Sequence, residues 1–216
     1  MTCVSFLGPF FVLGSFFPAW AGAAAILTSP TLVELEAEIH SKIGKVEPFE
    51  FIRKEAAKLG VRAYLFGGSA ASFANYSKWN WQRTRGDQRF SAERFDFDLT
   101  QIFRANQDVD VVLDGTAAQA VQLESALKKT YPELAGGKTI WEVRCLREVM
   151  GDKGALLGDP DFLNQHSDSQ STGLVELTTT PNGETSVRDL RDWQSKAPPF
   201  LQDVIEGRIH YYYNPA

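Results

Sequence analysis

The sequence predicts an α+β fold with a small mixed β-sheet flanked by helices. Segments with helical spacing alternate with short runs of β-branched and aromatic residues, and glycine or proline stands at most of their ends. The chain has 216 residues, of which 44% are hydrophobic and 23% are charged, an ordinary globular composition with enough length for one sizeable core. The net charge of −5 excludes a chain that is basic throughout.

The N-terminal segment is treated apart from the fold because residues 4–27 contain no charged side chain. We expect residues 1–21 to be a cleaved signal peptide, since small residues follow the apolar run where a signal peptidase cuts. An uncleaved membrane anchor is the second interpretation, and a misassigned start or a buried segment is the third. The expected location is therefore the periplasm, the exterior or a membrane surface. Cleavage would leave Cys145 alone, without an intrachain disulfide partner.

Two helices are predicted over residues 31–60. The first has apolar residues at helical spacing and Gly44 as its stop, and the second has Pro48 in its first turn and Gly60 as its stop. A strand of β-branched and aromatic residues follows at 61–66.

The remaining elements form the expected core over residues 61–180 and a helical extension over 181–216. An insert over 77–107, rich in basic and aromatic side chains, interrupts the core. The extension ends abruptly, so a truncated chain is one interpretation. The predicted elements are a helix at 69–79, a strand at 109–114, a helix at 116–134, strands at 138–146 and 173–180, and helices at 186–194 and 198–207.

The first candidate motif is a glycine turn. Gly67, Gly68 and Ser69 end a predicted strand and open a predicted helix. Without side chains at the glycines, backbone N–H groups approach a phosphate closely at the positive end of the helix dipole, and the Ser69 hydroxyl adds a donor. The turn lacks the Gly-Lys-Ser/Thr ending of a Walker loop and is neither a nucleophile elbow nor a dinucleotide fingerprint.

The second candidate motif is an aspartate pair. Asp108 and Asp110 are two residues apart on a predicted strand, so both carboxylates lie on one face, about 7 Å apart. Neighbouring carboxylates repel each other, and a divalent cation compensates for the repulsion. Mg²⁺ is held in proteins by one or two carboxylates together with substrate phosphates. A phosphate cradle and a carboxylate pair together indicate metal-assisted phosphoryl or nucleotidyl transfer.

In this order, the two motifs resemble the nucleotidyltransferase superfamily, which includes DNA polymerase beta and the CCA-adding and poly(A) polymerases. The resemblance covers about residues 61–180. It implies that Gly67, Gly68 and Ser69 bind the nucleotide triphosphate, and that Asp108 and Asp110 bind Mg²⁺ or Mn²⁺. It also implies a third carboxylate on a neighbouring strand.

Alternatives remain for the acidic residues. Asp96 and Asp98 form a second Asp-x-Asp pair, but Asp108 and Asp110 begin a better strand. Glu176, an acid flanked by apolar residues, is the preferred third carboxylate, and Asp168 is the runner-up.

The sequence thus predicts a metal-dependent nucleotidyltransferase that uses a nucleoside triphosphate and an unidentified acceptor: RNA, a protein or a small molecule. The apparent export signal conflicts with this activity because nucleoside triphosphates are scarce outside the cytoplasm. The alternative is a catalytically inactive nucleotidyltransferase-like binding module of the cell envelope, or a secreted effector. The basic and aromatic insert would bind a nucleic-acid backbone and stack bases, or would form a solvated loop or a packing cap over the sheet. Lys78 and Arg83 would alternatively contact a triphosphate.

Overall fold

The computed structural model describes residues 29–85, 106, 108–134, 136–150, 172–178, 187–190 and 196–207. The helices in these ranges are α1 (Leu32–Ile43), α2 (Glu47–Leu59), α3 (Gly67–Thr84), α4 (Ala117–Thr130), α5 (Leu146–Met150) and α7 (Pro199–Glu206). The strands are β1 (Arg62–Phe66), β2 (Asp108–Asp114), β3 (Glu133–Leu134), β4 (Gly137–Lys138), β5 (Ile140–Cys145), β6 (Gly173–Glu176) and β7 (Val187–Asp189).

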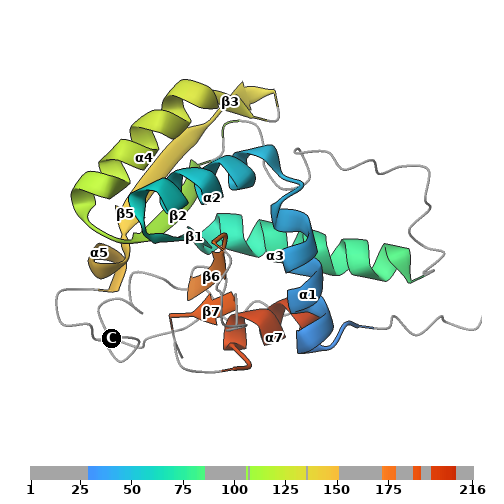
Figure 1. Ribbon diagram of the computed structural model, residues 1–216. Helices are drawn as coiled ribbons and strands as arrows, with labels where there is room; N and C mark the ends of the chain where they lie inside the picture. The colour runs from blue at the N-terminus through green and yellow to red at the C-terminus, as the bar shows by residue number, and fades with distance from the viewer. Residues whose placement is uncertain are drawn as a thin grey trace, which may run out of the picture.

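The main sheet has five strands in the order β5-β2-β1-β6-β7 (Figure 1). β2 and β5 are parallel, whereas β1 is antiparallel to both β2 and β6, and β6 is antiparallel to β7. β3 and β4 form a separate two-stranded ladder. The predicted α+β class, with a mixed sheet flanked by helices, is confirmed.

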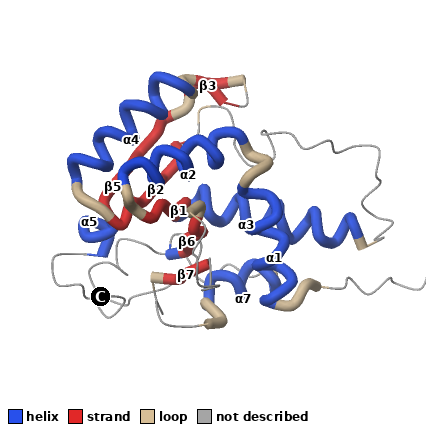
Figure 2. Tube along the Cα trace, in the orientation of Figure 1, coloured by secondary structure: helices blue, strands red, loops and turns tan. Residues whose placement is uncertain are grey.

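The two faces of the main sheet differ in what covers them. One face is covered by α1, α2, α3, α4 and α7 (Figure 2). Alternate side chains of the strands pack against these helices in the larger core. Val109, Val111 and Leu113 of β2 point into this core and are at most 1% exposed. The opposite face carries a smaller apolar cluster around Tyr64 and Val112, to which α5 contributes. Since side chains alternate along a strand, Asp108 and Asp110 lie on this opposite face.

Local sequence signals explain the ends of the N-terminal helices. Thr31 and Glu34 form a reciprocal capping box at the start of α1. Gly60 ends α2 in the left-handed conformation, with φ of 69°, which glycine adopts without steric cost. The predicted helices over 31–60 and the strand after them are therefore confirmed.

Several elements differ from the sequence prediction. Glu133–Leu134, at the end of the helix predicted over 116–134, form β3, and the strand predicted over 138–146 is divided between β4 and β5. The helix that opens at the glycines continues to Thr84, so α3 includes the first residues of the expected insert. Figure 1 shows α3 leaving the sheet at the end of β1 and extending past α1. Residues 186–194 were predicted as a helix, and this is wrong for Val187–Asp189, which form β7.

The β7 correction has a tertiary cause. Val187 and Asp189 are both fully buried, which requires the two-residue period of a strand. The Asp189 carboxylate accepts a hydrogen bond of 2.5 Å from the backbone N–H of Phe200, at the start of α7. Asp189 therefore caps a helix that begins ten residues later, and that partner is not visible from local sequence.

Within the described ranges, no helix has both the length and the apolar character needed to cross a bilayer. The expected signal segment, residues 1–21, and most of the expected insert lie outside the described residues.

Candidate functional site

The glycine turn lies where β1 passes directly into α3. Gly67 has a positive φ of 56°, a conformation that favours glycine, and α3 begins at this residue. Phe66 occupies the N-cap position of α3, and its side chain makes no capping hydrogen bond to the first turn of the helix. The first-turn N–H groups of a helix have no intrahelical acceptors, so this end presents donors and a partial positive charge. Gly68 is exposed, and a methyl group added to it would meet no atom within 4 Å.

Ser69 connects this turn to the aspartate strand. Its side chain is 1% exposed. Its Oγ accepts a hydrogen bond of 3.3 Å from the backbone N–H of Asp110, although the two residues are 41 positions apart in sequence. The structure therefore brings the glycine turn and the aspartate pair together, side by side at one end of β1.

Asp108 and Asp110 have a third acidic neighbour on β5. In the parallel β2–β5 pair, Asp108 is opposite Ile140 and Asp110 is opposite Glu142. Residues opposite each other share a face, about 5 Å apart, so Glu142 lies beside Asp110. Asp108 is exposed, and Asp110 and Glu142 are partly buried. In the described part of the chain, no three Asp, Glu, His or Cys side chains converge closely enough to hold one metal ion together.

Glu142 was missed by sequence reasoning, although a signal for it was present. In the β5 segment, Trp141, Val143 and Cys145 are buried, so Glu142 and Arg144 fall on the opposite face. That alternation is visible in the sequence. What was not visible is that β5 pairs with β2, in a register that places Glu142 against Asp110.

Arg144 adds a positive charge to this acidic face. Its guanidinium donates a hydrogen bond to the Glu142 carboxylate, forming an ion pair. The pKa of Arg144 is raised, first by this hydrogen bond and further by the negative charges of Glu142, Asp110 and Glu148. The Arg144 side chain is 51% exposed and that of Glu142 is 40% exposed, so solvent reaches the pair.

Glu176, the predicted third carboxylate, lies elsewhere on the sheet. It is opposite Tyr64, on the far side of β1 from β2. Two inter-strand spacings, about 10 Å, therefore separate its strand from that of Asp110. Its carboxylate accepts hydrogen bonds of 3.0 and 2.6 Å from Arg62 and one of 2.9 Å from the Thr178 hydroxyl. The structure thus does not bring Glu176 to the aspartate pair.

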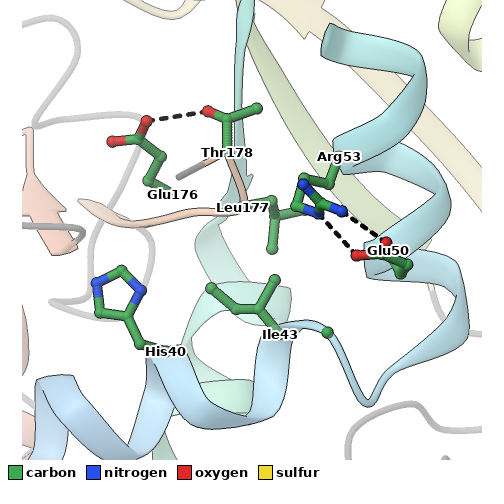
Figure 3. A pocket seen from close by; sticks show the side chains of 8 residues that line it. His40, Ile43, Glu50, Arg53, Glu176, Leu177 and Thr178 are labelled. Atoms are coloured by element: carbon green, nitrogen blue, oxygen red, sulfur yellow. Dashed lines mark hydrogen bonds and ion pairs between the residues drawn. The ribbon is translucent and has the colours of Figure 1, made fainter. Parts of the chain in front are cut away.

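Glu176 instead borders a cavity of about 210 Å³ between α1, α2 and the end of β6. Figure 3 shows Glu176 bonded to Thr178 on one side of this cavity, and Arg53 paired with Glu50 on the other. The backbone N–H of Leu177 is bonded to Ala63, near the start of β1, whereas the glycine turn follows its end. The cavity is therefore at the opposite end of β1 from the glycine turn.

The alternative acidic residues Asp96, Asp98 and Asp168 lie outside the described residues. Lys78, the first basic residue of the expected insert, donates a hydrogen bond of 2.9 Å to the carbonyl of Val204 in α7. Arg83 lies over the ring of Trp79, 5.4 Å from its centroid. These two insert residues are engaged in contacts within the fold.

No protein-family model matches the chain, and no curated protein matches it. A solved structure of a CCA-adding enzyme in complex with CTP matches this chain with 14% sequence identity and a TM-score of 0.44. The match covers 85% of this chain and 37% of the chain of the CCA-adding enzyme. The present chain thus spans little more than a third of that protein.

Proposed function

We propose that this chain is a nucleotidyltransferase-like domain that binds a nucleoside triphosphate at the start of α3 and presents it to the aspartates of β2. The observation that carries the proposal is the hydrogen bond from the Asp110 backbone to Ser69 Oγ. It joins a helix N-terminus suited to phosphate to a face with carboxylates suited to a cation. Neither motif alone indicates this chemistry; their contact in the folded chain does.

The glycine turn would bind the triphosphate. Backbone N–H groups of the first turn of α3 would donate hydrogen bonds to phosphate oxygens, and the helix dipole favours their negative charge. The exposed Gly68 leaves room for a phosphate to approach the backbone. Ser69 has a different role: its buried hydroxyl accepts from Asp110 and so holds the turn in position relative to β2.

The acidic face would take Mg²⁺ or Mn²⁺ together with the nucleotide. Asp108 and Asp110 would be the ligands, with Glu142 as the adjacent third carboxylate in place of Glu176. All three offer carboxylate oxygens, which these hard cations prefer, and phosphate oxygens and water complete such sites. Two protein carboxylates plus phosphates suffice for Mg²⁺, so the site does not require three converging side chains. The bound cation would lower the pKa of an attacking acceptor hydroxyl and neutralise charge on the leaving pyrophosphate.

The chain's own groups would orient these partners. The Ser69 contact holds the Asp110 backbone, which restricts the position of its carboxylate. Burial of Val109 and Val111 in the larger core holds β2 in register, so both aspartates face the ligand side. Transfer would then depend on the alignment of the nucleotide with the acceptor, which is how most phosphoryl-transfer sites achieve their rate.

One observation favours a second candidate, a catalytically inactive binding module. Glu142 is engaged by Arg144, which leaves the third carboxylate neutralised by the chain itself. Such a module would bind a nucleotide or another anion at the turn without transferring it.

Calorimetric titration of ATP, GTP, CTP and UTP into the full chain, with Mg²⁺ or Mn²⁺, tests the proposal. The double variant Asp108→Ala/Asp110→Ala should lose cation-dependent binding. Asp114→Ala is the matched control, because Asp114 is an exposed aspartate at the other end of the same strand. Binding that needs no cation and survives the double substitution would favour the inactive module. Absence of nucleotide binding by the folded native chain would contradict the nucleotidyltransferase-like function and leave only a module that binds another anion.

A further inference from the structure

β5 is the last strand at one end of the five-stranded sheet, and in the described part of the chain only its edge toward β2 is paired with another strand. An unpaired strand edge presents backbone N–H and C=O groups to which a strand of another chain can bond. Figure 1 shows α4 lying alongside β5. Whether the outer edge of β5 is open therefore depends on what α4 and the neighbouring segments place against it.

Two N–H groups on this outer edge already have acceptors within the fold. The N–H of Val143, in the middle of β5, donates a hydrogen bond of 3.1 Å to the carboxylate of Glu124 in α4. The N–H of Cys145 donates one of 3.3 Å to the carboxylate of Glu148. N–H groups alternate in direction along a strand, so both of these donors point away from β2. Glu148 is a local partner at the start of α5, whereas Glu124 reaches the edge from a separate helix.

Glu124 is held at the edge by its own helix. Its second carboxylate oxygen forms an ion pair with Lys128, one turn later in α4. Its side chain is 28% exposed, so the carboxylate stands between Val143 and the solvent. A strand that approached Val143 from outside would have to displace this charged acceptor, and charged side chains at sheet edges oppose strand addition in this way.

The sequence of β5 is complementary to itself about Val143. In an antiparallel pair centred on this residue, Glu142 would lie opposite Arg144 of a second copy, and Arg144 would lie opposite Glu142 of that copy. The two central Val143 residues would exchange N–H···O=C hydrogen bonds, using the same N–H that Glu124 now accepts. A second copy of this chain therefore matches the edge in both charge and hydrogen bonding.

We propose that Glu124 closes the outer edge of β5 against a second copy of this chain and thereby keeps the chain monomeric. Without the Glu124 carboxylate, the Val143 N–H would be open to the backbone carbonyl of the second copy. The inference does not depend on the proposed function, because neither Glu124 nor Val143 belongs to the nucleotide site.

Sedimentation equilibrium of the full chain tests the proposal at concentrations up to about 1 mM, so that a dimer with a Kd of that order is detected. The native chain should sediment with the mass of one chain. Glu124→Ala should approach twice that mass as the concentration rises, and alanine preserves the helix propensity of α4. Glu124→Gln is the matched control. It also loses the ion pair with Lys128, but its side-chain carbonyl still accepts from Val143, so it should remain a monomer.

A second substitution identifies the surface that associates. Arg144→Glu in the Glu124→Ala background would place like charges opposite each other in the antiparallel pair, so it should restore the monomer. The proposal is overturned if the native chain is already a dimer, or if folded Glu124→Ala stays a monomer throughout this range. It is also overturned if Glu124→Gln associates as strongly as Glu124→Ala, or if Arg144→Glu leaves the Glu124→Ala dimer intact.

Discussion

The Glu176 carboxylate accepts two hydrogen bonds from Arg62 and one from the Thr178 hydroxyl. Replacing Arg62 with methionine would remove the first two and leave the buried carboxylate with the Thr178 hydroxyl. Glu176 is 1% exposed in the intact fold, so its carboxylate depends on these donors more than on bulk water. Breaking a buried ion pair from one side typically costs about 3–5 kcal/mol. The Arg62 side chain is 35% exposed, which lowers our expectation to about 2–3 kcal/mol.

Glu176→Gln is the matched variant. It removes the charge and keeps the volume, so we expect a loss of about 1 kcal/mol, typical of an altered buried hydrogen bond. The double variant Arg62→Met/Glu176→Gln should be more stable than Arg62→Met alone, because no uncompensated charge remains. Urea unfolding at constant m-value measures all three free energies.

Two results would refute this reasoning. The first is a loss below about 0.5 kcal/mol for Arg62→Met, the size of an ordinary surface change. The second is a Glu176→Gln variant of native stability that no longer binds nucleotide with Mg²⁺. That result would return Glu176 to the nucleotide site, where the sequence alone placed it.

Three further predictions concern other parts of the chain. Gly68→Ala should fold with near-native stability, since its methyl group meets no atom within 4 Å, yet weaken nucleotide binding in calorimetry by obstructing the phosphate. Gly173→Ala should lose about 1–3 kcal/mol in urea unfolding because its methyl carbon would lie 2.4 Å from the ring of Phe200. The hydrogen bond from Arg53 lowers the pKa of Glu50 from its ordinary 4.5 to about 2. The pair therefore stabilises the fold above about pH 4.5, and this stabilisation is lost as the pH falls toward 2. Glu50→Gln should therefore show a flatter stability curve between those pH values, and an unchanged curve would contradict the pairing.

Local physical signals account for most of what the sequence predicted correctly. The apolar period of α1, the glycine stop at Gly60 and the apolar period of α4 each act within a few residues, so they can be read without the fold. The same holds for Gly67 and Ser69, because a turn between a strand and a helix is a local event.

The parts that sequence reasoning missed depend on contacts between distant segments. Glu142 becomes a neighbour of Asp110 only through the parallel pairing of β5 with β2. Glu176 attracted attention as an acid among apolar residues, but it is buried because Arg62 neutralises it from β1. Strand order and ion-pair partners are tertiary properties, and one sequence does not display them.

The hydrogen bond between Ser69 and Asp110 also bears on how much length the chain tolerates between its two motifs. The connection must return from the far end of α3, whose 18 residues span about 27 Å, to the start of β2. An extended backbone covers that distance in about eight residues, and each doubling of a flexible connection costs only about 0.6 kcal/mol in closure entropy. Additional sequence can therefore accumulate between Thr84 and Asp108 at little cost while the contact keeps the two motifs together. This connection is accordingly a suitable place for natural selection to add a recognition element, or for an engineer to insert a reporter domain.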